Sequence, residues 1–178
     1  KCRTGVDDND DYEFLKTFIN TVKDSGVKTF IVHARKGLLK GLSPRQNRNI
    51  PPLNYQKVYT LKEDFPELEI IINGGIKTIN ETKNHLNYVD GVMLGRAVYD
   101  DPFMLSNIDS EIFLDTKIEM NRKDLLTEYL DYVHFMTQKG YDPKIMLKHI
   151  FGLKKGENDA KRFRVKVAEI MNSSSWVE

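Results

Sequence analysis

Apolar runs of strand length alternate with segments of helical spacing over the first hundred residues. The strand-like runs cover residues 27–33, 68–72 and 89–94. Between them, apolar residues recur at helical spacing over residues 14–22, 55–65 and 78–86. Strands that alternate with helices predict a parallel sheet, with the loops at the strand carboxyl ends available for chemistry.

Capping and breaking residues predict where these helices begin and end. Asp10 or Asp11 can cap the first helix, and Ser25-Gly26 ends it. The second helix stops before Pro66. The apolar face expected for the first helix consists of Phe14, Leu15, Phe18, Ile19 and Val22.

After about residue 107 the strand-like runs stop. Asn121 caps a predicted helix that continues to about Gln138, Pro143 opens a second that ends near residue 152, and Asn158 or Asp159 opens a third. The sequence therefore predicts two domains, an α/β part over 1–106 and a helical part over 107–178. On the first of these helices the apolar stripe is Leu126, Leu130, Val133 and Met136.

Two glycine turns follow the last two strand-like runs. The first, called the glycine turn below, is Asn73-Gly74-Gly75-Ile76, and the second is Gly95-Arg96. Glycines let backbone N–H groups approach an anion, and Arg96 adds a bidentate cation. Either turn alone also fits an ordinary strand-to-helix connection. As a pair they indicate a phosphate site of the kind found at the last two strands of a (β/α)8 barrel.

The chain has 178 residues, whereas a whole (β/α)8 barrel needs about 250. We therefore expect the α/β part to be the C-terminal half of a TIM barrel. The first residue, Lys1, is interpreted as a cut point inside a larger protein, because a natural chain normally starts with methionine.

Basic residues gather in two stretches although the net charge is only +1. The basic loop, residues 34–50, contains Arg35, Lys36, Lys40, Arg45 and Arg48 without an acid, and residues 144–166 also contain mainly basic charges. A polyanion is a candidate partner. The single cysteine fits a reducing compartment, and no run is long enough for a membrane span, so we expect a cytoplasmic or organellar protein without membrane contact.

The expected strand ends bring Lys1, Arg3 and His33 to the same side as the two glycine turns. Such a cationic pocket suits a phosphorylated, electron-accepting cofactor such as FMN, with Lys1 beside the flavin edge that becomes anionic on reduction. Two simpler alternatives remain open: Lys1 can be a solvated terminal lysine, and His33 can be satisfied by backbone at a strand end.

Several motifs of the chain together resemble the tRNA-dihydrouridine synthases, most closely the DusA branch. They are Lys1-Cys2-Arg3-x-Gly5-Val6-Asp7-Asp8, Phe30-Ile31-Val32-His33-Ala34-Arg35-Lys36, Gly41-Leu42-Ser43-Pro44, Asn47-Arg48, Ile50-Pro51-Pro52-Leu53, Ile72-Asn73-Gly74-Gly75-Ile76 and Asp90-Gly91-Val92-Met93-Leu94-Gly95-Arg96-Ala97.

The resemblance implies an FMN enzyme that uses NADPH to reduce uridines in the tRNA D-loop, monomeric at full length and without a metal. It implies flavin contacts at Lys1, His33, Asn73, Gly74, Gly75, Gly95 and Arg96. The tRNA contacts expected in the barrel half are Arg35, Arg45 and Arg48. In the helical part, Lys161-Arg162-Phe163-Arg164 resembles an Arg-x-x-Arg tRNA signature, so Lys161 and Arg164 are the corresponding positions.

Two departures from the family pattern affect this interpretation. Lys161 stands at an arginine position and gives up bidentate phosphate binding. The Gly-Cys-Pro motif that carries the catalytic cysteine is absent, and Cys2 alternates with pocket-facing residues and so points away. We therefore expect the acid upstream of residue 1 and no activity from this fragment alone. The alternatives are an FMN barrel reductase that acts on a small molecule, and an inert RNA-binding module.

Overall fold

The computed structural model describes residues 1–114, 116 and 119–173. The chain divides into two compact units, Lys1–Gly95 and Arg96–Glu178. In the first unit the elements are β1 (Cys2–Arg3), α1 (Tyr12–Lys23), β2 (Thr29–His33), the 3-10 helix η1 (Gln46–Arg48), α2 (Tyr55–Asp64), β3 (Glu69–Asn73), α3 (Ile79–Leu86) and β4 (Gly91–Met93).

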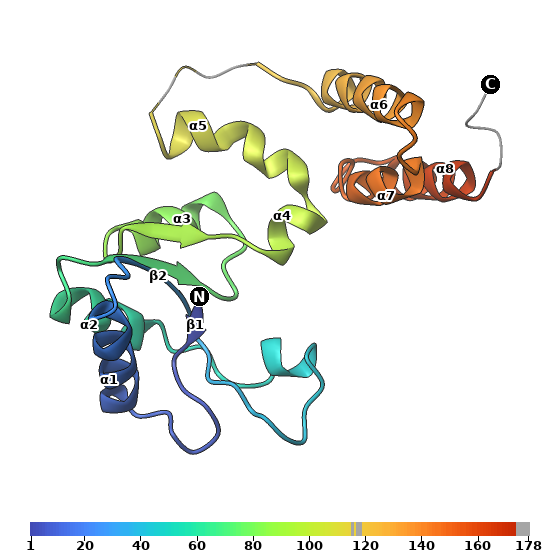
Figure 1. Ribbon diagram of the computed structural model, residues 1–178. Coiled ribbons are helices and arrows are strands. Elements are labelled where there is room, and N and C mark those ends of the chain that lie inside the picture. The colour runs from blue at the N-terminus through green and yellow to red at the C-terminus, as the bar shows by residue number, and fades with distance from the viewer. Residues whose placement is uncertain (115, 117–118, 174–178) are drawn as a thin grey trace. The chain divides into compact units, whose positions relative to one another are not determined.

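The four strands found in the described residues form one parallel sheet in the order β1-β2-β3-β4. The helices α1, α2 and α3 lie beside these strands (Figure 1). This arrangement confirms the predicted α/β class. Each strand includes fewer residues of its apolar run than the sequence predicted. Val89, for example, is buried in the core but lies outside β4.

The main core lies between one face of the sheet and the helices α1 and α2. Alternate strand residues supply it, with Val32 from β2 and Ile72 from β3 fully buried. The helices add Leu15, Ile19, Val58 and Leu61. Since strand side chains alternate, residues 31, 33, 71 and 73 belong to the opposite face.

The first helix begins as predicted but buries less of its apolar face. The Asp11 side chain accepts a hydrogen bond from the Phe14 N–H at 2.7 Å and caps α1. Phe14 and Phe18, expected in the core, are 39% and 42% exposed. The helix is apolar over a wider arc than the sheet covers. The two rings instead line a groove of about 620 Å³ together with Cys2 and Leu39.

The second unit is helical throughout its described residues. It contains α4 (Arg96–Asp100), the 3-10 helix η2 (Pro102–Asn107), α5 (Ile108–Glu111), α6 (Arg122–Gln138), α7 (Pro143–Leu147), the 3-10 helix η3 (Lys148–Ile150) and α8 (Ala160–Asn172). The three predicted helices are confirmed, although the second continues as a 3-10 turn after Leu147. A helix was expected after the second glycine turn, and α4 is that helix, whereas η2 and α5 were not predicted.

A separate core holds the second unit together. It combines Val133 of α6 with Leu147, Ile150, Leu153 and Val167. Leu130, predicted on the apolar stripe of α6, is 36% exposed, because only part of that stripe packs against α7 and α8. No helix in the described part of the chain is both long and apolar enough to cross a membrane.

The first compact unit ends at Gly95, whereas the sequence predicted a domain boundary after residue 106. That boundary concerns the domains of the whole protein and stays a prediction.

Candidate functional site

One row of residues crosses the carboxyl ends of all four described strands. The register aligns Arg3 with His33, His33 with Asn73, and Asn73 with Met93. Their neighbours Val32 and Ile72 point into the core, so this row lies on the face opposite the helices. The structure thus brings the predicted site residues His33 and Asn73 together at one end of the sheet.

Two contacts hold this row together. The Lys1 Nζ lies 3.0 Å from the Met93 Sδ, so Lys1 reaches from the β1 edge to the β4 edge. The Asn73 amide donates a hydrogen bond of 2.7 Å to the Met93 carbonyl. Asn73 therefore fixes the end of β4 relative to β3. Lys1 is exposed, and its positive charge lies on the same face of the sheet as His33.

Any other residue in the glycine turn would be strained. Gly74 and Gly75 have φ of +119° and +72°, a region that L side chains rarely adopt. A Cβ on Gly74 would lie 2.6 Å from the His33 Cδ2, and one on Gly75 would lie 2.6 Å from the Leu53 Cδ1. The turn therefore packs directly against His33, while Gly75 itself is exposed.

Glu81 and Thr78 bind N–H groups at the start of the helix that follows the glycine turn. The Glu81 carboxylate accepts hydrogen bonds from the N–H groups of Lys77, at 2.6 Å, and Thr78, at 3.0 Å. The Thr78 hydroxyl accepts from the Glu81 N–H in return, which completes a capping box. These bonds hold the pKa of Glu81 below its usual value, and the bond from the Lys77 N–H has the largest effect. The N–H groups of Lys77, Thr78 and Glu81 are thus already used within the chain.

The second glycine turn joins the two units of the chain. Gly95 is exposed, and a Cβ added there would meet no atom within 4 Å. Arg96 is the exposed first residue of α4. Its predicted role with Gly95 in binding phosphate stays a prediction.

Two arginines, Arg3 and Arg35, hold the ends of the basic loop by hydrogen bonds to backbone carbonyls. The Arg3 guanidinium donates hydrogen bonds of 2.9 Å to the carbonyls of Lys36 and Asn47. Arg35 donates to the Pro51 carbonyl, and its Nε is buried without a hydrogen-bond partner among the described residues. Arg35, predicted as a tRNA contact, is thus also built into the fold of this loop.

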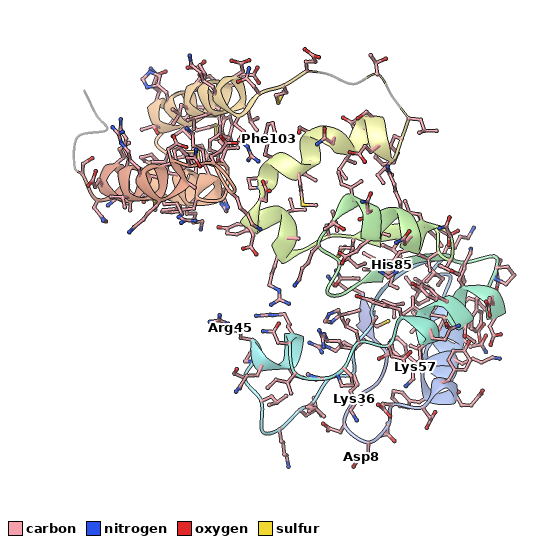
Figure 2. The ribbon with its side chains drawn as sticks, turned by 180° about the vertical axis from the view of Figure 1, so that it is seen from behind. Asp8, Lys36, Arg45, Lys57, His85 and Phe103 are labelled. Carbon is pink, nitrogen blue, oxygen red and sulfur yellow. The ribbon has the colours of Figure 1, made fainter. Side chains whose placement is uncertain are left out.

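Positive charge accumulates around these two arginines. Burial lowers the pKa of Arg3, and the nearby charges of Arg48 and Arg35 lower it further. Arg45 and Arg48 are exposed, and Figure 2 shows Arg45 beside the short helix η1. Lys36, by contrast, is paired with Asp10 at 3.3 Å. The loop therefore offers solvent mainly arginine charge, which suits phosphate oxygens.

The predicted Arg-x-x-Arg positions lie at the start of α8 in the second unit. Lys161 and Arg164 are both exposed and three residues apart, so they share one side of the helix. Phe163 packs against the core of this unit, with the Lys154 Nζ 5.8 Å from its ring centroid. This packing orients the two cations toward solvent.

Some residues near the glycine turn escaped the sequence analysis. Tyr55 was predicted as one apolar position of α2, yet its hydroxyl donates a hydrogen bond to the Gly74 carbonyl at 2.8 Å. His85 is 7% exposed and packs against the Tyr55 ring. Helical spacing assigns both to a buried face, and the hydroxyl of Tyr55 was the one available sign of a polar role.

Among the described residues, no group of three or more His, Cys, Asp or Glu side chains is arranged to hold a metal ion.

Cys2 was predicted to point away from the pocket, toward the other face of the sheet. Cys2 is half-buried against the main core, as its alternation with Lys1 and Arg3 predicted, and burial raises the pKa of its thiol.

Comparison with known proteins gives one consistent result. The family model described as dihydrouridine synthase (Dus) matches residues 1–176. The tRNA-dihydrouridine(20/20a) synthase of Shewanella oneidensis is 43% identical over 169 residues, which cover 95% of this chain and 50% of that protein. The proteins of the same name from Shigella flexneri and Vibrio cholerae are 44% and 42% identical, over 95% of this chain and 50% and 52% of their own lengths. The chain spans about half the length of the curated relatives it matches.

Proposed function

The chain belongs to the dihydrouridine synthase family, and we propose that its protein reduces uridine to 5,6-dihydrouridine in the D-loop of tRNA, with FMN as cofactor and NADPH as reductant. Membership confirms the resemblance found in the motifs, including its DusA branch. The reaction, the cofactors and the tRNA region belong to the proposal. They rest on the printed names of the relatives and on the site described above.

The residues at the strand ends fit the phosphate of a flavin mononucleotide. Gly74 and Gly75 present backbone without side chains, and Gly75 is exposed. A Cβ added to Gly95 would meet no atom within 4 Å, and the next residue, Arg96, has an exposed guanidinium. We assign the phosphate to these four residues. This observation, a glycine backbone at positive φ packed against His33, carries the proposal.

Each remaining site residue has a role in the proposed reaction. A bound FMN would pass a hydride from NADPH to the C5=C6 bond of uridine. Lys1 would hold positive charge next to the flavin, and His33 would contact flavin and substrate. Asn73 keeps the β3 and β4 ends in place through the Met93 carbonyl. We assign the general acid to a cysteine outside residues 1–178, because Cys2 packs into the core.

The exposed cations would hold the tRNA. Arg45 and Arg48 of the basic loop lie in the same unit as the strand ends, whereas Lys161 and Arg164 belong to the helical unit. Arg35 would act mainly by keeping the basic loop in shape, through its bond to Pro51. Shape recognition of RNA depends on such phosphate contacts, and a target uridine must leave its stack to reach a flavin.

The proposal can be tested by comparing two arginine variants in the full natural protein. Arg96→Ala should lower FMN retention at least tenfold, since a charge-assisted contact contributes about 1.5–3 kcal/mol. Arg45→Ala removes another exposed arginine, one that we assign to tRNA, and should leave retention unchanged. The measurement is FMN released per mole of purified protein. Equal retention in both variants would reject the phosphate assignment.

A further inference from the structure

The hydroxyl of Tyr55 contacts a peptide of the glycine turn that has an N–H group to offer to a phosphate. It donates a hydrogen bond of 2.8 Å to the Gly74 carbonyl. The Gly74–Gly75 peptide is trans, so its N–H points away from that carbonyl and hence away from Tyr55. Gly74 is buried and Gly75 exposed, so the turn is open to solvent at the residue that carries this N–H.

A turn made of two glycines needs such a contact. Glycine adopts positive and negative φ almost equally well, so a Gly-Gly peptide can rotate between two orientations at small cost. In one orientation it offers an N–H to an anion, and in the other a carbonyl oxygen that repels the anion. The hydrogen bond from Tyr55 stabilises the first orientation and is lost in the second.

Tyr55 is itself held firmly. It opens α2, and the preceding Asn54 donates its N–H to the Ala34 carbonyl at 2.8 Å, which anchors the helix to the end of β2. Its ring meets the buried His85 of α3 edge to face, with centroids 4.5 Å apart at 67°. Figure 2 marks His85 on that helix. The Tyr55 hydroxyl therefore reaches the turn from a site fixed by β2, α2 and α3.

The chemical state of the hydroxyl suits this contact. Burial raises the pKa of Tyr55, and the negative charge of Glu81 raises it further against an opposing effect of Arg35. The hydroxyl thus stays protonated and able to donate at neutral pH.

We propose that Tyr55 is a positioning residue for the flavin phosphate, which fixes the Gly74–Gly75 peptide with its N–H toward the anion. The inference rests on the proposed function, since it requires FMN at this strand end. Tyr55 does not itself touch the cofactor. Its effect is therefore confined to ligands that carry the phosphate.

The test compares FMN with riboflavin, which has the same ring system but no phosphate. Full natural protein stripped of flavin is titrated with each ligand by fluorescence, as parent, Tyr55→Phe and Tyr59→Phe. Tyr55→Phe should weaken FMN binding about three- to tenfold, the value of one hydrogen bond, and leave riboflavin binding unchanged. Tyr59 lies on the same helix, and its hydroxyl bonds the His85 Nδ1 at 2.7 Å instead of the turn. Tyr59→Phe should therefore keep the FMN-to-riboflavin affinity ratio of the parent.

The outcomes separate the inference from the proposed function. A parent protein that binds riboflavin as tightly as FMN would overturn the phosphate site, and the inference with it. A parent that prefers FMN, with Tyr55→Phe at the same ratio, would overturn only the role of Tyr55, whether both affinities fall together or neither changes. Riboflavin binding also reports whether the Tyr55→Phe variant is folded.

Discussion

At the scale of single residues, the site depends on how closely His33 and the glycine turn approach each other. The imidazole occupies the space where any side chain at position 74 would begin. A residue that is expected to contact flavin and uracil is thereby held against the backbone expected to hold the phosphate. Substitutions at Gly74 should therefore disturb both the His33 side chain and the backbone of the glycine turn.

Gly74→Ala tests this close approach. The new Cβ would need to fit 2.6 Å from the His33 Cδ2 at a φ of +119°, so both strain and overlap oppose it. Gly26→Ala provides the control, because Gly26 has a φ of +93° but no atom within 4 Å of an added Cβ. Both variants should lose about 1–2 kcal/mol to backbone strain, and Gly74→Ala roughly 1–3 kcal/mol more to overlap. Denaturant unfolding of the full natural protein measures the difference, and equal losses would show that His33 yields without cost.

At the scale of elements, local sequence signals predicted the helices well and the contacts between them poorly. Asn121 caps α6 by accepting from the N–H groups of Lys123 and Asp124, as its position before the apolar stripe predicted. Such signals are local. The hydroxyl bond from Tyr55 to Gly74 joins residues nineteen apart and depends on β2, α2 and β3 packing together. No spacing rule contains that information.

The capping box of α3 predicts how stability depends on pH. The pKa of Glu81 is lowered in the folded protein, chiefly by the Lys77 N–H, from the ordinary value of 4.5. A lowered carboxylate pKa means that the stabilisation is present above about pH 4.5 and is lost as the pH falls through the folded value. Glu81→Gln should therefore lower Tm at pH 7 and lower it less at pH 3.

The measurement is Tm against pH between these limits. Glu128→Gln, which changes an exposed glutamate within α6, should run parallel to the parent. A curve for Glu81→Gln that also stays parallel to the parent would show that the carboxylate charge does not stabilise α3.

At the scale of the whole molecule, the alternation of apolar runs was sufficient to predict the parallel sheet and the helical second unit. It also placed His33 and Asn73 at one edge, because the ends of parallel strands meet there. It could not separate structural from exposed cations. Lys36 and Arg35 look equivalent to Arg45 and Arg48 in the sequence, yet the first two bond within the fold. That distinction depends on which carbonyls and carboxylates the folded loop brings near each cation.

This distinction gives a test of the proposed tRNA surface by salt dependence. Each phosphate contact contributes about 0.7–0.9 to the slope of log K against log salt. Replacing Arg45, Arg48, Lys161 and Arg164 with alanine in the full natural protein should therefore reduce the slope by roughly 3. The control replaces four lysines of the barrel half, Lys16, Lys23, Lys28 and Lys62, and changes the net charge equally. Three of these pair with Asp64, Glu67 and Asp90, so their charge is already compensated and the slope should stay close to that of the parent. An equal reduction of the slope in both quadruple variants would mean that overall charge, rather than these four exposed cations, governs tRNA binding.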